Sequence, residues 1–431
     1  MVLGISPHNL SGVRRFWVET LGCPKNQVDS DKITGLLVED GMAAAEAPED
    51  ADLVVVNTCA FIEDARQESV DTVLEMRSAA TDAELVVTGC MAERYGAELA
   101  EALPEADRVA GFGVPVSIGA KPSVSPASVD LPEFDLLNLP RPPAEAPWAY
   151  VKIAEGCDRR CGYCAIPGFR GQQRSRSPEA IMTEVEGLGV REAVLVAQDL
   201  ASYGRDQGQG ERGIIPLVES LRQRVEWVRL LYLYPSDLTD LLIDAICATG
   251  VPYFDLSLQH VSRPLLARMR RWGDGHRFAA RIADIRQSQP EAVFRSNFIV
   301  GYPGETEADH DALLEFVAEV GLDWCGFFTY SAEAGTYATT LDGEVAAELA
   351  AERRRELAEV QDEITAAKRD QLIGHEVEVL VDAPGIARSF REAPEIDGVI
   401  AVPDHLTVGQ FHTVKVTDAL GPDLLAEAVP S

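Results

Sequence analysis

Apolar runs of strand length alternate with amphipathic stretches of helix length through the first quarter of the chain. Short strands separated by helices pair in parallel, because each helix carries the chain back across the sheet. We therefore expect a flavodoxin-like parallel α/β domain over residues 12–120. The expected strands are residues 16–20, 53–56 and 85–87, and the expected helices are residues 28–40, 62–76 and 92–103.

The same alternation continues on a larger scale over residues 148–365. Six βα units in about 200 residues predict a partial, open TIM-like (βα)6 barrel, whose reactive groups lie at the C-terminal ends of its strands. The strand candidates are residues 150–153, 193–197, 228–233, 254–258, 294–300 and 326–329.

The pattern changes between these two domains and again after the second. Residues 121–147 hold seven prolines and little periodicity, which is typical of a linker of restricted flexibility. Residues 344–370 predict one long helix. Strict alternation then follows at residues 376–381 and 411–416, with Gly and Pro between, and predicts a small antiparallel β-barrel in the C-terminal domain, residues 366–431.

The charge balance is strongly acidic, with 70 Asp and Glu against 38 Lys and Arg and a net charge of −32. Such a chain as a whole repels nucleic acid, whose binding needs an excess of Lys and Arg, and more easily accommodates a basic protein partner. The alternative is that the acidity serves solubility alone. No apolar window approaches the length of a membrane span, so we expect no membrane partner.

Cysteine usage and the first 15 residues both suggest where the chain resides. Residues 1–15 contain neither an apolar core nor a cleavage site of a secretory signal. Eight cysteines in a large chain of this kind fit a reducing cytosol, where they more often bind metal or act in catalysis than form disulfides. A cytoplasmic location is therefore expected.

Three cysteines follow the first expected barrel strand in a C-x3-C-x2-C motif; we call Cys157, Cys161 and Cys164 the loop cysteines. Structural zinc sites use four protein ligands, and ordinary electron-transfer 4Fe-4S clusters use four cysteines. Three thiolates leave one iron of such a cluster open for a small molecule. The motif therefore indicates an iron–sulfur cluster that takes part in chemistry.

A second set of three cysteines follows the expected strands of the first domain; we call Cys23, Cys59 and Cys90 the strand-end cysteines. The carboxyl ends of parallel strands share one edge of the sheet, where ligands bind. These side chains are therefore expected to meet in space. A shared metal site explains three equivalent positions better than three independently buried cysteines do, although single buried cysteines are common.

Together these features resemble the radical S-adenosylmethionine (radical-SAM) methylthiotransferases, from about residue 16 to the end. The resemblance implies an N-terminal three-cysteine domain, a radical-SAM barrel and a C-terminal TRAM β-barrel. It implies that the loop cysteines ligate a 4Fe-4S cluster whose open iron binds S-adenosylmethionine (SAM). It also implies that the strand-end cysteines hold a second 4Fe-4S cluster, which carries the sulfur to be methylated and transferred.

The resemblance also implies positions near SAM, without assigning a catalytic residue. Tyr163 is the aromatic residue before the last loop cysteine, and Gln198 and Tyr203 lie in the family's segment beside SAM. Gly301 and Glu305 close the fifth barrel strand, where glycine lets the backbone approach the adenine or ribose. An ordinary strand–helix turn is the alternative for this last segment.

Basic residues gather near the loop cysteines. They suit an anionic ligand or a carboxylate substrate at the barrel mouth, or they belong to a solvated surface. They are Lys152, Arg159, Arg160, Arg170, Arg174, Arg176, Arg268, Arg270, Arg271 and Arg277.

Three other residues of metal-binding type are set apart from both cysteine sets. Cys247 and Cys325 are expected to be buried small apolar residues. His260, at a strand end, either faces the site or is a hydrogen-bonded structural histidine.

The family acts either on adenosines in tRNA or on an aspartate of ribosomal protein S-12, and three segments are similar to the protein-modifying branch. They are residues 23–26, 57–62 and 233–237, while Gln27 departs from the aliphatic residue expected there. Residues 374–431 carry three Lys and Arg against ten Asp and Glu, a net charge of −7, which fits a basic protein better than RNA.

The resulting hypothesis is methylthiolation at the β-carbon of an aspartate of protein S-12, with an electron donor of the reduced flavodoxin or ferredoxin type. tRNA adenosine is the alternative substrate. A non-catalytic zinc or iron–sulfur binding protein is the alternative of another class.

Overall fold

The computed structural model describes residues 12–116, 135–208 and 213–429. The chain divides into two compact units. Unit 1 takes Met1–Pro142 with the short segment Gly168–Arg170, and unit 2 takes Pro143–Pro167 and Gly171–Ser431. Much of the predicted proline-rich linker, residues 121–134, lies outside the described residues. The predicted limits of the three domains and of the linker stay predictions.

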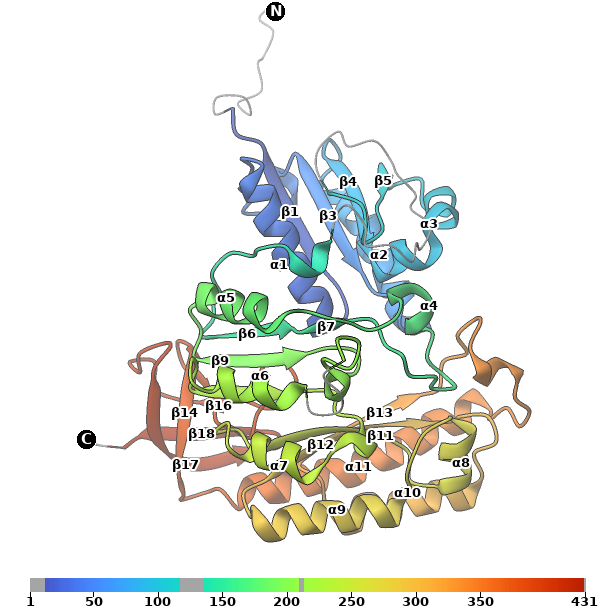
Figure 1. Cartoon of the computed structure of the whole chain (residues 1–431), viewed down its shortest axis with the longest axis vertical. Coiled ribbons are helices and arrows are strands. Elements are labelled where there is room, and N and C mark those ends of the chain that lie inside the picture. Colours follow the sequence, from blue (N-terminus) through green and yellow to red (C-terminus); the bar gives the residue numbers. More distant parts are fainter. Residues whose placement is uncertain (1–11, 117–134, 209–212, 430–431) are drawn as a thin grey trace, which may run out of the picture. The chain divides into compact units, whose positions relative to one another are not determined.

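Unit 1 is built on a five-stranded parallel sheet with strand order β2-β1-β3-β4-β5 (Figure 1). This is the flavodoxin-like order, so the predicted fold of the first domain is confirmed. The strands are β1 (Arg15–Thr20), β2 (Ala43–Ala44), β3 (Leu53–Thr58), β4 (Glu84–Gly89) and β5 (Arg108–Val109). The sequence pattern missed β2 and β5, because two residues are too few to form an apolar run.

The helices of unit 1 are α1 (Pro24–Glu39), α2 (Glu63–Ala79) and α3 (Cys90–Ala102). Helix α1 begins four residues before the predicted start at Val28, since the pattern-based start needed an apolar residue and Pro24 occupies the first turn instead. Pro has no backbone N–H to lose at that position and its φ angle suits a helix.

Unit 2 contains six parallel strands in two adjoining sheets, with orders β10-β9-β6 and β11-β12-β13 (Figure 1). A parallel bridge between Leu233 and Leu256 joins the two. The predicted partial (βα)6 barrel is therefore confirmed. Its strands are β6 (Trp148–Lys152), β9 (Glu192–Val196), β10 (Trp227–Leu230), β11 (Tyr253–Gln259), β12 (Val293–Val300) and β13 (Trp324–Thr329).

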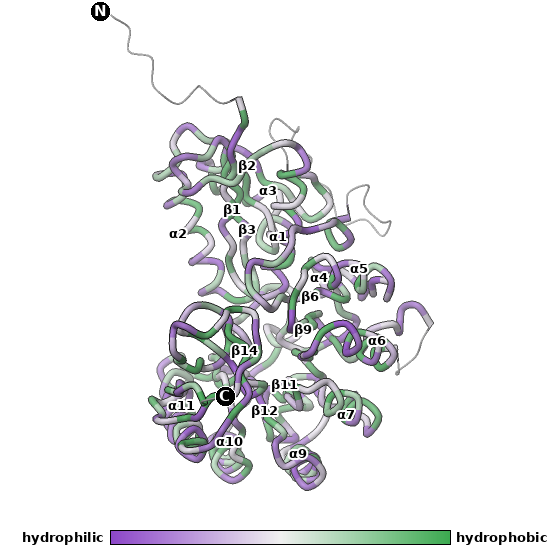
Figure 2. The backbone as a smooth tube through the Cα atoms, turned by 90° about the vertical axis from the view of Figure 1, so that its left-hand side faces the viewer, coloured by the Kyte–Doolittle hydropathy of each residue, from purple (hydrophilic) through white to green (hydrophobic). Residues whose placement is uncertain are grey.

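The helices of this barrel mix hydrophobic and hydrophilic residues along their length, as the mixed colours of the tube show (Figure 2). Helix α5, for example, buries Ile181, Val185 and Leu188, which recur at helical spacing. The helices are α5 (Pro178–Leu188), α6 (Ile214–Leu221), α7 (Asp240–Cys247), α8 (Arg263–Arg268), α9 (Gly275–Ser288), α10 (Glu307–Val320) and α11 (Ala347–Asp370). The short helix α4 (Ile166–Arg170) belongs to unit 2 only through its first two residues. A short hairpin pairs β7 (Ala154–Glu155) with β8 (Arg174–Ser175).

The C-terminal part of unit 2 is a closed five-stranded barrel in the order β14-β15-β16-β18-β17. The predicted small β-barrel is confirmed, with one difference: β16 and β18 run parallel, while the other neighbours are antiparallel. An odd number of strands in a closed ring cannot alternate throughout, so one parallel pair is required. The strands are β14 (Glu376–Ala383), β15 (Ile386–Arg388), β16 (Ile400–Ala401), β17 (Phe411–Leu420) and β18 (Asp423–Ala428).

A buried charge network joins this small barrel to the larger one within unit 2. The Glu192 carboxylate, at the start of β9, lies 2.7 Å from Nε of Arg229 and 2.8 Å from Nη1 of Arg388. Arg388 also binds Asp382. Burial pushes the pKa of Glu192 up, but the two guanidinium groups outweigh it and hold that pKa below its usual range. The carboxylate of Glu192 keeps both of its partners only while the small barrel packs against the larger one.

Replacement of Glu192 by glutamine is expected to lower the free energy of unfolding by about 3–5 kcal/mol, because two buried guanidinium groups lose their counter-charge. Urea unfolding followed by circular dichroism measures the loss. Glu186→Gln is the matched control: its ion pair with Arg224 is half exposed, and such pairs contribute about 1 kcal/mol or less. Equal losses in the two variants would contradict a stabilising role for the network.

Candidate functional site

The loop cysteines lie between the hairpin strand β7 and helix α4, at the C-terminal side of the first barrel strand, as predicted. All three are partly exposed. Gly156 precedes the first of them with a φ of +78°, and a Cβ there would lie 2.1 Å from the carbonyl oxygen of Gln172. Only glycine therefore allows the chain to enter the loop along this path.

Backbone hydrogen bonds hold the loop to three other segments of the barrel. Cys157 N donates to Gly171 O at 3.1 Å, and Gly162 N donates to Met269 O at 2.8 Å. Gly162 O in turn accepts from Ala338 N at 2.8 Å. A loop tied at these points presents its thiols in one arrangement before any ligand binds, which lowers the entropic cost of binding.

Arg271 is the charged group in contact with a loop cysteine. Its Nη1 donates to Cys161 Sγ at 3.3 Å, its Nη2 donates to Ser257 O, and the guanidinium carbon lies 4.0 Å from the centre of the Tyr234 ring. From the sequence, Arg271 was one of the basic residues near the loop cysteines, and its contact with Cys161 was not predicted. Burial raises the pKa of Cys157 to about 11, so binding of this thiol to iron releases a proton.

The residues predicted beside SAM are partly engaged within the fold. Gln198 Nε2 donates to the Glu155 carboxylate, and Gln198 Oε1 is buried with no hydrogen-bond partner among the described residues. The Tyr203 hydroxyl donates to Arg176 O at 2.8 Å, and the residue is 1% exposed. Tyr163 is partly buried, and burial raises the pKa of its hydroxyl well above the usual range. Their contact with SAM stays a prediction.

Gly301 and Glu305 form the turn after β12. The Glu305 carboxylate accepts from the backbone N–H groups of Gly301 and Tyr302. A Cβ on Gly301, whose φ is +75°, would lie 2.6 Å from the Cβ of Ala350. These contacts are those of a closely packed strand–helix turn, and contact of the turn with adenine or ribose stays a prediction.

Carboxylates of unit 2 pair with many of the predicted basic residues, so the group carries less free positive charge than its sequence suggests. Arg159 pairs with Asp199 and Asp237, and Arg160 is exposed. The other pairs are Lys152–Glu155, Arg176–Glu184, Arg268–Asp342 and Arg277–Asp274.

The strand-end cysteines share one edge of the unit 1 sheet. Cys59 and Cys90 directly follow β3 and β4, which are neighbours, and Cys23 follows β1, the other neighbour of β3. Gly22 packs against Cys59 so closely that a Cβ on residue 22 would lie 2.9 Å from Cys59 Sγ. The structure thus brings the loops after β1 and β3 together, as the parallel topology predicts.

Asn26 cross-links the loops that carry these cysteines. Its Nδ2 donates to Leu21 O at 2.8 Å and to Thr58 O at 3.1 Å, and its Oδ1 lies 3.6 Å from Cys90 Sγ. Asn26 is fully buried. In the sequence, Asn26 stood out only as part of the family resemblance, because its hydrogen-bond partners Leu21 and Thr58 come close to it only in the folded chain.

The strand-end cysteines differ in how readily they ionise. Burial raises the pKa of Cys59 to about 12 and raises that of Cys90. Burial also pushes the pKa of Cys23 upward, but the charges of Lys25 and Arg170 and nearby backbone N–H groups outweigh it, and its pKa lies below the usual range. Cys23 is therefore the thiol of the three that loses its proton most easily.

The strand-end cysteines suit an iron–sulfur cluster better than a site for a single metal ion. Among the described residues, no three His, Cys, Asp or Glu side chains are arranged to hold a single ion. Each cysteine of a 4Fe-4S cluster binds a different iron, so its thiolates stand around the cluster and do not converge on one point. Soft thiolates at three neighbouring strand ends fit such a cluster.

The three remaining candidates, Cys247, Cys325 and His260, lie in or against the packed interior of unit 2. Cys247 and Cys325 pack against the core of the larger barrel, but they are partly buried rather than fully buried as expected. His260 is fully buried, and its Nδ1 accepts from Ser262 N at 3.0 Å. Burial lowers the pKa of His260 to about 4, so the ring is neutral at physiological pH. This is the structural alternative that the sequence left open.

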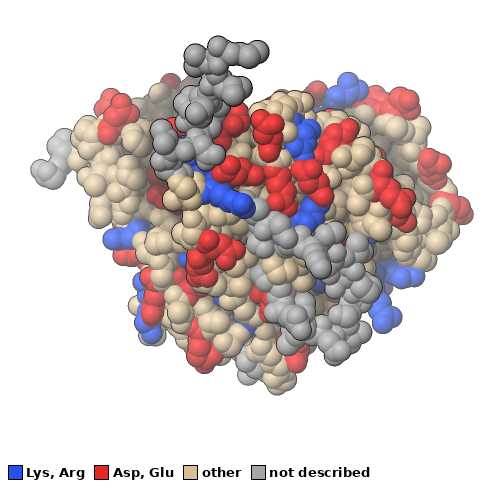
Figure 3. All heavy atoms as spheres, turned by 90° about the horizontal axis from the view of Figure 1, so that it is seen from above, with Lys and Arg blue, Asp and Glu red and all other residues tan. Residues whose placement is uncertain are grey.

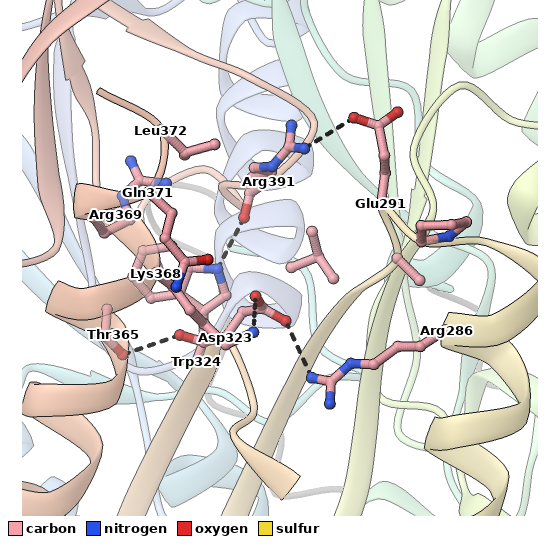
Figure 4. Close-up of a pocket in the computed structure, with 13 residues that line it drawn as sticks. Arg286, Glu291, Asp323, Trp324, Thr365, Lys368, Arg369, Gln371, Leu372 and Arg391 are labelled. Carbon is pink, nitrogen blue, oxygen red and sulfur yellow. Dashed lines mark hydrogen bonds and ion pairs between the residues drawn. The ribbon is translucent and has the colours of Figure 1, made fainter. Parts of the chain in front are cut away.

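A pocket of about 200 Å³ in unit 2 lies where β12 and β13 begin, the end of the strands away from the loop cysteines (Figure 4). Two ion pairs lie within the pocket: Lys368 lies 2.9 Å from Asp323, and Arg391 lies 3.0 Å from Glu291. Barrel enzymes bind their substrates at the C-terminal ends of the strands. This pocket therefore belongs to the junction between the two barrels of unit 2.

A three-cysteine loop after the first strand of an open six-stranded parallel barrel defines a radical-SAM enzyme. Three family matches agree: the Radical SAM superfamily matches residues 151–317, Uncharacterized protein family UPF0004 matches residues 15–111, and the TRAM domain matches residues 373–429.

Curated relatives cover nearly the full length of the chain. It is 42% identical to the "Ribosomal protein uS12 methylthiotransferase RimO" of Moorella thermoacetica, over 94% of this chain and 96% of that protein. Proteins of the same description from Aquifex aeolicus and Kineococcus radiotolerans are 40% and 39% identical, each over 95% of this chain and 96% of the relative. The chain therefore belongs to the RimO family of radical-SAM methylthiotransferases.

Family membership decides the class of protein and its cofactors. The chain is an enzyme, so the alternative of a non-catalytic binding protein is wrong. Its cofactors are two 4Fe-4S clusters and SAM. None of the helices in the described part of the chain has both the length and the apolar character needed to cross a membrane.

Proposed function

We propose that this enzyme attaches a methylthio group to the β-carbon of an aspartate in ribosomal protein uS12. The observation that carries the proposal is the match, over nearly the whole of both chains, to relatives whose names specify that substrate. Acidity supports a basic protein substrate: residues 374–431 have a net charge of −7, and Asp and Glu outnumber Lys and Arg on the face shown in Figure 3.

We infer that the loop cysteines hold the cluster that binds SAM and that the strand-end cysteines hold the second cluster. When bound, these groups supply reductive cleavage of SAM and delivery of sulfur. The chain's own part is to orient them. Backbone bonds of Gly162 fix the first loop, Arg271 donates to Cys161 Sγ, and Asn26 ties the strand-end loops together.

Two further inferences accompany this function. The electron for SAM cleavage comes from a donor of the reduced flavodoxin or ferredoxin type, because the clusters need a low-potential one-electron source. The enzyme acts in the cytoplasm, since its proposed substrate is a ribosomal protein. tRNA is the rival substrate, and the acidity of the TRAM barrel disfavours it.

A competition assay tests the substrate. Reconstituted enzyme, SAM and reductant are incubated with equal amounts of uS12 and bulk tRNA, and mass spectrometry follows both. The mass of a methylthio group is expected on an aspartate of uS12 and not on tRNA nucleosides. A uS12 variant with that aspartate replaced by alanine is the matched control and should stay unmodified. Methylthio groups found only on tRNA would overturn the substrate assignment.

A further inference from the structure

Arg170 is a buried arginine aimed at the strand-end cysteines. It ends helix α4 and lies in the segment Gly168–Arg170 that packs as part of unit 1. Its Nη2 lies 2.9 Å from Cys90 Sγ and 2.7 Å from Asn26 Oδ1. The residue is only 7% exposed. A guanidinium group therefore reaches the sulfur of one proposed cluster ligand from a segment far from it in sequence.

Two further contacts hold the guanidinium group in this position. Arg170 Nη1 lies 3.1 Å from Asp29 Oδ2, and both side chains are almost completely buried. The guanidinium carbon also lies 4.2 Å from the centre of the Phe112 ring. Burial of an unpaired arginine is costly, and the Asp29 carboxylate offsets that cost. The side chain is thus held on several sides while one N–H points to sulfur.

The direction of the contact with Cys90 is set by chemistry. A guanidinium group carries only N–H donors, so the sulfur has to accept the hydrogen bond. A thiolate bound to iron is a good acceptor, whereas a neutral thiol is a weak one. The geometry therefore suits a cysteine that holds a cluster.

We propose that Arg170 is a positioning residue of the second cluster: it holds the Cys90 sulfur in place and, by donating to it, raises the reduction potential of that cluster. Reduction adds negative charge to a cluster, and a nearby positive donor stabilises the reduced form more than the oxidised one. The proposal rests on the proposed function in one respect, namely that the strand-end cysteines hold a cluster.

The test uses the full chain with all three loop cysteines replaced by alanine, so that only the second cluster is present. Arg170→Gln is made in this background, and the midpoint potential is measured by a redox titration followed by electron paramagnetic resonance. We expect a shift to more negative potential in R170Q. A smaller shift is expected in R170K, which keeps the charge and one donor.

Arg77→Gln is the matched control. Arg77 also belongs to unit 1 and also makes several hydrogen bonds, to Glu105 O, Ala83 O and Asp107, at the opposite ends of the strands from the cysteines. Its loss should leave the midpoint potential and the iron content unchanged. This variant separates an effect on the cluster from a general effect of removing a well-bonded arginine.

The outcomes separate clearly. Loss of iron from R170Q but not from R77Q supports the positioning role, as does a negative shift with iron retained. An unchanged midpoint with full iron content, or an equal loss of iron from R170Q and R77Q, would overturn it. A parent variant that binds no cluster at all would instead overturn the assignment of the strand-end cysteines, before Arg170 is tested.

Discussion

Replacement of all three loop cysteines by alanine is expected to abolish cleavage of SAM, with a loss of more than about 10⁴-fold. The loop offers Cys157, Cys161 and Cys164 as its only thiols and is held rigidly by Gly162. Without the thiolates no iron is held beside the barrel mouth, and SAM has no reductant. Release of 5′-deoxyadenosine under anaerobic, reducing conditions measures the reaction, and iron content should fall to about four per chain.

Cys247→Ala is the control for this experiment. Cys247 packs against the core of the same barrel, so its removal costs some packing but no cluster ligand. SAM cleavage should persist in this variant. Undiminished cleavage in the triple variant would rule out the loop cysteines as the SAM site, and a purified wild-type protein that contains zinc and leaves SAM intact would contradict both clusters.

Replacement of the strand-end cysteines by alanine is expected to have a different effect: SAM is still cleaved, but no methylthio product forms. Cys23, Cys59 and Cys90 lie on unit 1, whereas the loop cysteines lie on unit 2, so the two sets can be removed separately. Because the second cluster is the proposed carrier of sulfur, its loss removes the group to be transferred. The product falls below detection, a loss of more than about 10⁴-fold.

Two measurements on the same sample decide this prediction. 5′-Deoxyadenosine reports radical formation, and mass spectrometry of uS12 reports sulfur transfer. Iron content should fall to about four per chain, as in the other triple variant. A methylthiolated product from this variant would show that sulfur reaches the substrate without the strand-end cysteines. Loss of SAM cleavage together with the product would show that the two cysteine sets do not divide the reaction as proposed.

Local patterns explain why so much of the fold was predictable. Strands β3 and β4 are buried along almost their whole length, so each forms an apolar run that can be recognised from the sequence alone. The strands β2 and β5 are two residues long and have no such run. The start of α1 was misplaced because Pro24 and polar residues open the helix.

The candidate ligands were predictable for a similar reason. Their identity depends on residue type and on position after a strand, both of which are local. The residues that orient them were not predictable, because Asn26 and Arg170 act through partners that come close only in the folded chain. The same holds for Glu192, whose second arginine lies 196 residues further along.

By itself the sequence determined the parallel sheet, the open barrel, the small β-barrel and the two cysteine sets, since periodicity and spacing are properties of short segments. Only the tertiary structure decided which buried polar groups hold those elements and cysteines in place. Arg170 and Cys90 are 80 residues apart, and their contact follows from which segments pack together. Such pairings leave no periodic trace in a single chain, because a hydrogen bond needs only that two groups meet.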